Sequence, residues 1–122
     1  MLQNLKEQGK KLIIATSKPE EYTIKILKHF DLYKYFDFVA GATKDGSRGE
    51  KAEIITYALE NSNIEDKSQA VMVGDRKYDI LGAKENGIDS IGVLIGFGDC
   101  EELTNAGATY IAEAVEDVLK YV

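Results

Sequence analysis

The sequence is poor in the side chains that disulfide and nucleophilic chemistry need. Its 122 residues include one cysteine, Cys100, and one histidine, His29. A single cysteine excludes an internal disulfide, which fits a reducing cytoplasm. The two residues lie in different segments, and neither is assigned a catalytic role. Cys100 is interpreted as an incidental thiol, and His29 as a surface histidine near a helix C-terminus.

Positive charge and long hydrophobic runs are also scarce. The chain has 15 Lys and Arg against 21 Asp and Glu, and this net charge of −6 argues against a nucleic-acid partner. No apolar run approaches the ~20 residues that span a bilayer, and the N-terminus lacks a signal-peptide pattern, which argues against a membrane partner. With 44% apolar and 30% charged residues, the composition predicts one globular domain over residues 1–122 and a cytoplasmic location.

What the chain does contain is an alternation of strands and helices. Strands are expected at Lys11–Thr16, Asp37–Gly41, Ala70–Gly74, Asp89–Leu94 and Ala108–Ala112. Helices are expected at Pro19–His29, Glu50–Asn61, Asp99–Ala106 and Val115–Tyr121, with another from near Asp79 to about Glu85 and one that ends at Gly9. The segment 41–49 is expected to be an exposed connection. This alternation predicts an α/β fold, a parallel sheet with helices on both sides.

Two aspartates follow the third of these strands. Asp75 stands directly after Gly74, and Asp79 falls in the first turn of the next helix. Ligands bind at the carboxyl ends of the strands in open parallel sheets, so the two carboxylates are candidates for a Mg²⁺ site. The same residues also suit an ordinary Gly-Asp turn before an acidic first helical turn, and the pair alone leaves both interpretations open.

Two other segments carry groups that bind anions. Thr16 and Ser17 end the first strand, and the helix N-terminus that follows offers free N–H groups and a favourable dipole. Lys51 lies in the first turn of a later helix, where it opposes the dipole and therefore favours a nearby anion. The alternatives are Ser17 as a plain helix cap and Lys51 as an ordinary exposed lysine.

If these groups lie together at one edge of the sheet, they are suited to phosphoryl transfer. Hydroxyls and N–H groups bind phosphate oxygens, a lysine offsets their charge, and carboxylates hold Mg²⁺. The motifs resemble those of the haloacid dehalogenase-like (HAD) hydrolases, in particular the phosphoglycolate phosphatase-like branch. Ile13–Pro19 is similar to the family's second motif, Arg48–Lys51 to its third and Val73–Asp79 to its fourth, with supporting matches at Gly96–Gly98 and Gly107–Tyr110.

The resemblance implies a three-layer, Rossmann-like fold and a Mg²⁺-dependent phosphatase. Such an enzyme hydrolyses a small phosphomonoester, such as phosphoglycolate, a nucleotide or a sugar phosphate, through an aspartyl-phosphate. The resemblance further implies catalytic roles for Thr16, Lys51 and Asp75, substrate binding by Thr16, Ser17, Lys18 and Lys51, and metal binding by Asp75 and Asp79.

The sequence departs from the family at its first motif. The Asp-x-Asp-x-Thr strand that carries the family's nucleophile has no counterpart here, and neither has the helical cap that helps to select the substrate. The chain alone is therefore expected to be inactive or nearly so. The resemblance places the nucleophile strand between the strands that end at Thr16 and Gly74. A sheet without its central strand is expected, and a strand-exchanged homodimer is one way to pair the exposed edges.

Other functions are compatible with parts of this sequence. The main alternative is a non-catalytic α/β module that binds phosphate or Mg²⁺, or that self-associates. A phospho-acceptor receiver domain needs an acidic pair after the first strand, where this chain has Thr16 and Ser17. A dinucleotide site is rejected because Gly96-Phe97-Gly98 lacks the third glycine of that fingerprint.

Overall fold

The protein is described by a computed structural model that covers residues 2–43, 45–64, 66–94 and 99–122. The chain divides into two compact units, Met1–Ile64 and Glu65–Val122. Each unit contains a parallel sheet of its own. Strands β1 (Ile13–Pro19) and β2 (Phe38–Ala42) form one sheet, and β3 (Val71–Gly74), β4 (Asp89–Val93) and β5 (Tyr110–Ala112) form the other in that order.

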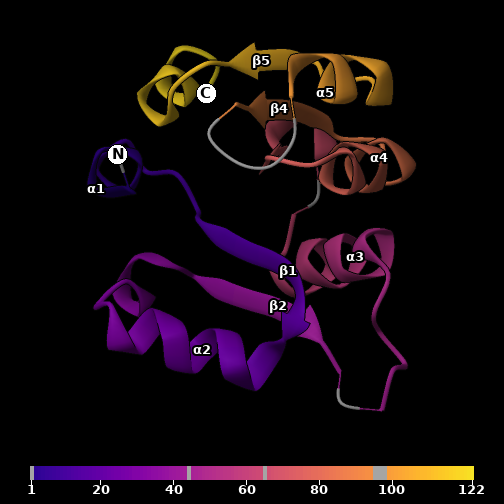
Figure 1. Ribbon diagram of the computed structural model, residues 1–122. Coiled ribbons are helices and arrows are strands. Elements are labelled where there is room, and N and C mark those ends of the chain that lie inside the picture. Colours follow the sequence, from indigo (N-terminus) through magenta and orange to yellow (C-terminus); the bar gives the residue numbers. More distant parts are fainter. Residues whose placement is uncertain (1, 44, 65, 95–98) are drawn as a thin grey trace. The chain divides into compact units, whose positions relative to one another are not determined.

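The first unit is a two-stranded sheet between two helices. Helix α1 (Leu2–Glu7) precedes β1, α2 (Glu20–His29) links β1 to β2, a 3-10 turn lies at Tyr33–Tyr35, and α3 (Lys51–Asn61) follows β2. Ala40 of β2 packs against Ile54 and Ala58 of α3, together with Ile13 and Ala15 of β1. Because side chains alternate between the faces of a strand, the residues between these point to the other face. Helix α2 covers that face (Figure 1).

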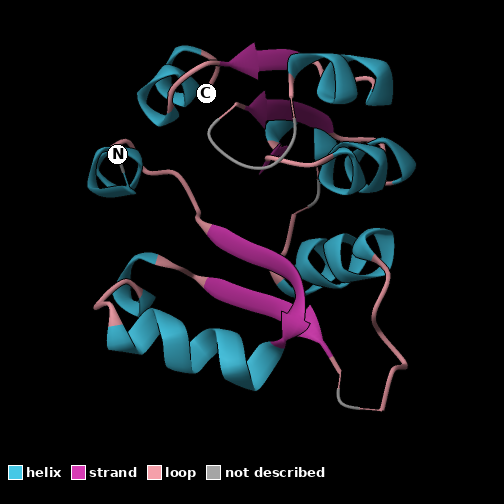
Figure 2. Ribbon diagram, in the orientation of Figure 1, coloured by secondary structure: helices cyan, strands magenta, loops and turns pink. Residues whose placement is uncertain are grey.

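The second unit has a three-stranded sheet that is also covered on both faces (Figure 2). Helix α4 (Lys77–Glu85) links β3 to β4, α5 (Cys100–Ala106) links β4 to β5, and a 3-10 helix spans Val115–Lys120. Ile91 and Val93 pack against Val118 of the 3-10 helix. On the opposite face, Ile80 of α4 and Leu103 of α5 form a second cluster. Each face of this sheet therefore has its own apolar core.

The α/β organisation predicted from the sequence is confirmed, with local differences. Strand β1 continues to Pro19 because that residue pairs again with β2, at Ala42. Pro19 is the N-cap of α2, one position before the first helical residue. The helix expected at Val115–Tyr121 is present as a 3-10 helix, Val115–Lys120. The stretch Gly96–Gly98 lies outside the described residues. Among the described residues, no helix is both long and apolar enough to cross a membrane.

Strands β1 and β3, like β2 and β5, are edge strands of their sheets as described. Among the described residues, β1 is hydrogen-bonded to β2 alone and β3 to β4 alone. Their apolar side chains are incompletely covered: Ile13, Ile14 and Met72 are half-buried, and Val73 keeps 42% of its surface exposed. An unpaired edge of this kind is a template for another strand. The missing central strand itself stays a prediction.

Candidate functional site

The end of β1 leaves the sheet and returns to it. Ala15 pairs with Ala40 and Pro19 pairs with Ala42, so the three residues Thr16–Lys18 stand opposite the single residue Gly41. Such a bulge turns backbone groups and side chains away from the ladder. The candidate phosphate-binding residues therefore sit in a segment that is tied to β2 at both ends and displaced from it between them.

The bulge has an internal hydrogen bond and exposed polar groups. The Lys18 N–H donates to Thr16 Oγ1 at 3.2 Å, and this leaves the Thr16 hydroxyl hydrogen available to donate. Ser17 and Lys18 are exposed. The interpretation of Ser17 as a helix cap is wrong, because Pro19 is the N-cap and no side chain caps α2. A ligand can thus reach the exposed Ser17 and Lys18 and the first turn of α2.

Lys51 reaches the same end of β1 from a different element. It is the first residue of α3, whose start is fixed by a capping box between Glu50 and Glu53. Its Nζ donates to the backbone oxygen of Ala15 at 3.3 Å. Because Ala15 immediately precedes Thr16, the structure places the Lys51 ammonium beside the bulge. A half-buried cation next to a hydroxyl and a helix N-terminus is suited to bind an anion.

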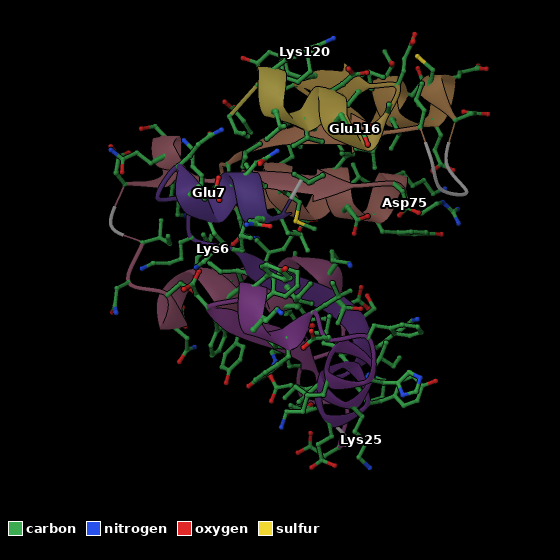
Figure 3. All side chains as sticks on the ribbon, turned by 90° about the vertical axis from the view of Figure 1, so that its left-hand side faces the viewer. Lys6, Glu7, Lys25, Asp75, Glu116 and Lys120 are labelled. Atoms are coloured by element: carbon green, nitrogen blue, oxygen red, sulfur yellow. The ribbon has the colours of Figure 1, made fainter. Side chains whose placement is uncertain are left out.

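The two aspartates lie where β3 passes into α4. Asp75, labelled in Figure 3, follows β3 directly and is half-buried. Asp79 is buried, with 7% of its surface exposed, and its Oδ2 accepts a hydrogen bond from the Arg76 N–H at 3.4 Å. The Asp79 side chain fills the space that a Cβ on Gly74 would occupy. The Asp79 carboxyl is therefore turned back from α4 to the tip of β3.

An ion pair that the sequence did not reveal ties this junction to α5. Arg76 Nε donates to Glu102 Oε2 at 3.0 Å, and the Lys77 N–H donates to the same oxygen at 3.1 Å. The hydrogen bond from Arg76, followed by that from the Lys77 backbone, lowers the pKa of Glu102. Only structure could pair these residues, since 26 positions separate Arg76 from Glu102. The pair fixes the start of the helix that carries Asp79.

The donors in the second unit fit a hard cation. Mg²⁺ is commonly held by one or two carboxylates and completes its coordination with water and phosphate oxygens. Asp75 and Asp79 offer two carboxylates at one strand tip. In the part of the chain that the structure describes, no group of three or more His, Cys, Asp or Glu side chains could hold a metal. Two carboxylates leave the other coordination positions of such a cation to water or to phosphate oxygens.

The candidate residues form two sets. The structure brings Thr16, Ser17, Lys18 and Lys51 to the end of β1 in the first unit, and Asp75 and Asp79 to the end of β3 in the second. The first set is called the anion set below, and the second the carboxylate set. That the two sets share one pocket stays a prediction.

Comparison with known proteins gives a consistent result. The family model for haloacid dehalogenase-like hydrolases matches residues 1–93. The chain is 37% identical over 114 residues to the tyrosine-protein kinase PtkA of Mycobacterium tuberculosis. It is 38% identical over 103 residues to a 5'-nucleotidase of Pseudomonas aeruginosa, and phosphoglycolate phosphatases also match. Among solved structures, a predicted phosphatase from Clostridium acetobutylicum has a TM-score of 0.95 and 47% identity.

These matches cover most of this chain but a smaller share of the other proteins. They span 93% of the chain and 39% of the kinase, 84% and 46% for the nucleotidase, and 98% and 55% for the crystallised phosphatase. The chain thus spans about half the length, or somewhat less, of these relatives.

Proposed function

The chain belongs to the haloacid dehalogenase-like hydrolases, and we propose from this that it supplies the phosphate- and metal-binding residues of a Mg²⁺-dependent phosphatase. The substrate is a small phosphomonoester, of the phosphoglycolate, nucleotide or sugar phosphate kind. The observation that carries the proposal is the position of Lys51, whose ammonium lies 3.3 Å from the Ala15 oxygen, directly beside Thr16. A lysine in that position can bind an anion that occupies the bulge.

Each candidate residue has a separate task in this proposal. The Thr16 and Ser17 hydroxyls, with Lys18, hold the phosphate oxygens, and Lys51 offsets their negative charge. Asp75 and Asp79 hold the Mg²⁺, which neutralises charge on the phosphate when it is bound. The covalent step needs an aspartate nucleophile of the kind found in the family's first motif. For the chain by itself we expect little or no hydrolysis.

The proposal extends to the organisation of the chain. Both units belong to one core domain, in a cytoplasmic protein, and the edges of β1 and β3 pair with a strand that is not among the described strands. A homodimer that exchanges strands is one way to satisfy these edges.

The proposal is tested by ligand binding rather than by turnover. Isothermal titration calorimetry of the chain with Mg²⁺ and inorganic phosphate should give saturable heats. Asp75→Asn should abolish the response to Mg²⁺, and Lys51→Met should weaken phosphate binding by about tenfold, the effect of one charge-assisted hydrogen bond. Asp89→Asn, an exposed position on β4, is the matched control and should behave as the parent chain. Absence of heat in the parent chain would refute the proposal.

Two other functions can be separated in the same experiments. A non-catalytic binding module would bind Mg²⁺ and phosphate, yet show no turnover of any phosphomonoester when the family's nucleophile strand is supplied. The similarity to a tyrosine-protein kinase favours a second candidate, transfer of the phosphoryl group to a tyrosine. Incubation with γ-labelled ATP and phosphotyrosine detection would distinguish transfer from hydrolysis.

A further inference from the structure

The segment between β2 and α3 contains one side chain that is held on several sides. Arg48 Nε donates to the Gly41 oxygen at 2.9 Å, and Nη2 lies 3.3 Å from Glu20 Oε1. The guanidinium carbon is 3.6 Å from the centroid of the Tyr57 ring. Only 18% of the Arg48 side chain is exposed. The expectation of an exposed connection is therefore wrong at Arg48.

The backbone of Arg48 is fixed as well. Its N–H donates to Thr43 Oγ1 at 2.9 Å, and its carbonyl oxygen accepts from the Thr43 N–H at 2.9 Å. Main chain and side chain are thus anchored to different elements: the end of β2, the first turn of α2 and the second turn of α3. These elements surround the anion set.

Arg48 and Glu20 together complete the end of β2 opposite the bulge. The Gly41 carbonyl accepts from Arg48, and the Gly41 N–H lies 3.4 Å from Glu20 Oε1. A Cβ on Gly41 would come within 2.6 Å of the Glu20 Cα and 2.9 Å of the Lys18 oxygen. The bulge and the first residue of α2 therefore press directly on the residue that Arg48 holds.

This arrangement needs an arginine rather than any cation. A planar guanidinium can stack on a tyrosine ring and donate in two directions at once, whereas an ammonium offers a point charge on a flexible stem. The ion pair with Glu20 is partly exposed, so Coulomb attraction alone contributes little. What the contacts provide is a fixed geometry between the start of α2 and the start of α3, three residues after Arg48.

We propose that Arg48 is a positioning residue of the anion set, which holds the Lys51 ammonium and the Thr16–Lys18 bulge in the arrangement that binds phosphate. The inference rests on the proposed function, because it assigns to Arg48 the alignment of that same site. Arg48 acts through Glu20, Gly41 and Tyr57, and its guanidinium does not contact the phosphate.

The test compares phosphate binding with folding in a set of variants. Arg48→Met removes both the planar guanidinium and its positive charge, and Arg48→Lys retains the charge alone. Lys25→Met is the matched control. Lys25 projects from the exposed surface of α2 (Figure 3), and its substitution removes one positive charge, as Arg48→Met does. Binding of inorganic phosphate is followed by NMR at constant ionic strength, with the Lys51 side-chain ¹³Cε signal as the reporter. Thermal unfolding is measured in parallel.

We expect Arg48→Met and Arg48→Lys to raise the phosphate dissociation constant about tenfold, the equivalent of one charge-assisted hydrogen bond. The Lys51 ¹³Cε signal should shift in both variants before phosphate is added, and Lys25→Met should match the parent chain. Tyr57→Leu, which retains the arginine and removes its stacking surface, gives a milder change of the same kind if an Arg48 variant fails to fold.

The outcomes separate this inference from the proposed function. If the parent chain does not bind phosphate, the proposed function fails. If the parent chain binds and Arg48→Lys binds equally well, Arg48 acts through charge alone and the positioning role is refuted. An unchanged Lys51 signal with an altered melting temperature would leave Arg48 a purely structural role and would also overturn the inference.

Discussion

Asp45 shows that hydrogen bonds within a short exposed segment can lower the pKa of a carboxyl group. The Ser47 N–H donates to Asp45 Oδ1 at 3.0 Å. This bond, together with the hydroxyls of Ser47 and Thr43, lowers the pKa of Asp45 from 3.8 to about 2. The residue lies between Thr43 and Arg48, whose backbones bond to each other. The ionised form of Asp45 therefore supports the segment that precedes α3.

A pH-dependent effect follows for Asp45→Asn. The folded-state pKa is lowered, so the ionised carboxylate stabilises the fold above the unfolded value of 3.8, and the contribution is lost as the pH falls through about 2. The parent chain should be more stable than the variant at pH 5 to 7, and the difference should shrink as the pH falls from about 4 to below about 2. Urea unfolding at several pH values measures this. Ser47→Ala should move the Asp45 pKa upward in a carboxyl NMR titration, and an unmoved pKa would contradict the assignment.

At the scale of residues, the positions of the candidate side chains were easier to predict from the sequence than their contacts. Lys51 and Asp79 could be placed in first helical turns from periodicity, and the structure confirms both positions. The contacts of Arg48 could not be predicted, because the glycines around it are typical of an exposed loop and its partners Glu20 and Tyr57 are distant in sequence. Such pairings depend on how β2 packs between two helices, which no local pattern encodes.

The junction of β3 and α4 depends on a glycine, Gly74, which has no side chain. Gly74 leaves room for the Asp79 side chain to fold back over the strand tip. A helix that begins with an acidic residue at this position is stabilised by the dipole as well. The junction therefore combines a helix-capping carboxyl with a position suited to a cation.

Substitution of this glycine should disturb binding more than an ordinary surface change. In Gly74→Ala the new Cβ overlaps the Asp79 side chain, so Asp79 must turn away and the fold should lose about 1–3 kcal/mol. Binding of Mg²⁺ should weaken at least tenfold in calorimetry. Gly49→Ala, where a Cβ would meet nothing within 4 Å, is the control and should leave both quantities unchanged. Normal Mg²⁺ binding by a folded Gly74→Ala chain would argue against Asp79 as a ligand.

At the scale of elements, the strands and their order along the chain were predictable, and some boundaries were not. Apolar runs and stop signals located each strand within a few residues. The extension of β1 to Pro19 was missed because it depends on renewed pairing with Ala42 after the bulge. The 3-10 form of the last helix was missed because a helical apolar pattern does not separate the two helix types over six residues.

Each of the two units has its own apolar packing, and strands β1 and β3 are incompletely covered. The apolar clusters of the two units are separate, and β1 and β3 each have one neighbour among the described strands. Exposed strand edges with apolar side chains favour association. The proposed strand-exchanged homodimer is therefore tested by the oligomeric state of the chain in solution.

A charge on β3 should reduce association if that strand takes part in it. Val73 is 42% exposed, and Val73→Lys places a charge where a partner strand would bury it, a device that blocks strand addition. Size-exclusion chromatography with light scattering should show dimer for the parent chain and monomer for the variant. Leu81→Lys, equally exposed but on α4, should retain the dimer. A monomeric parent chain at all concentrations would exclude the proposal.

The bulge at Thr16–Lys18 also determines where the chain tolerates changes of length. The bulge lies between two paired positions, Ala15 with Ala40 and Pro19 with Ala42. An inserted or deleted residue there changes the loop and leaves the alternation of inward and outward side chains in Ile13–Ala15 intact. A change in the length of this loop is therefore expected to alter the surface that would meet the ligand, while the apolar core behind it keeps its register.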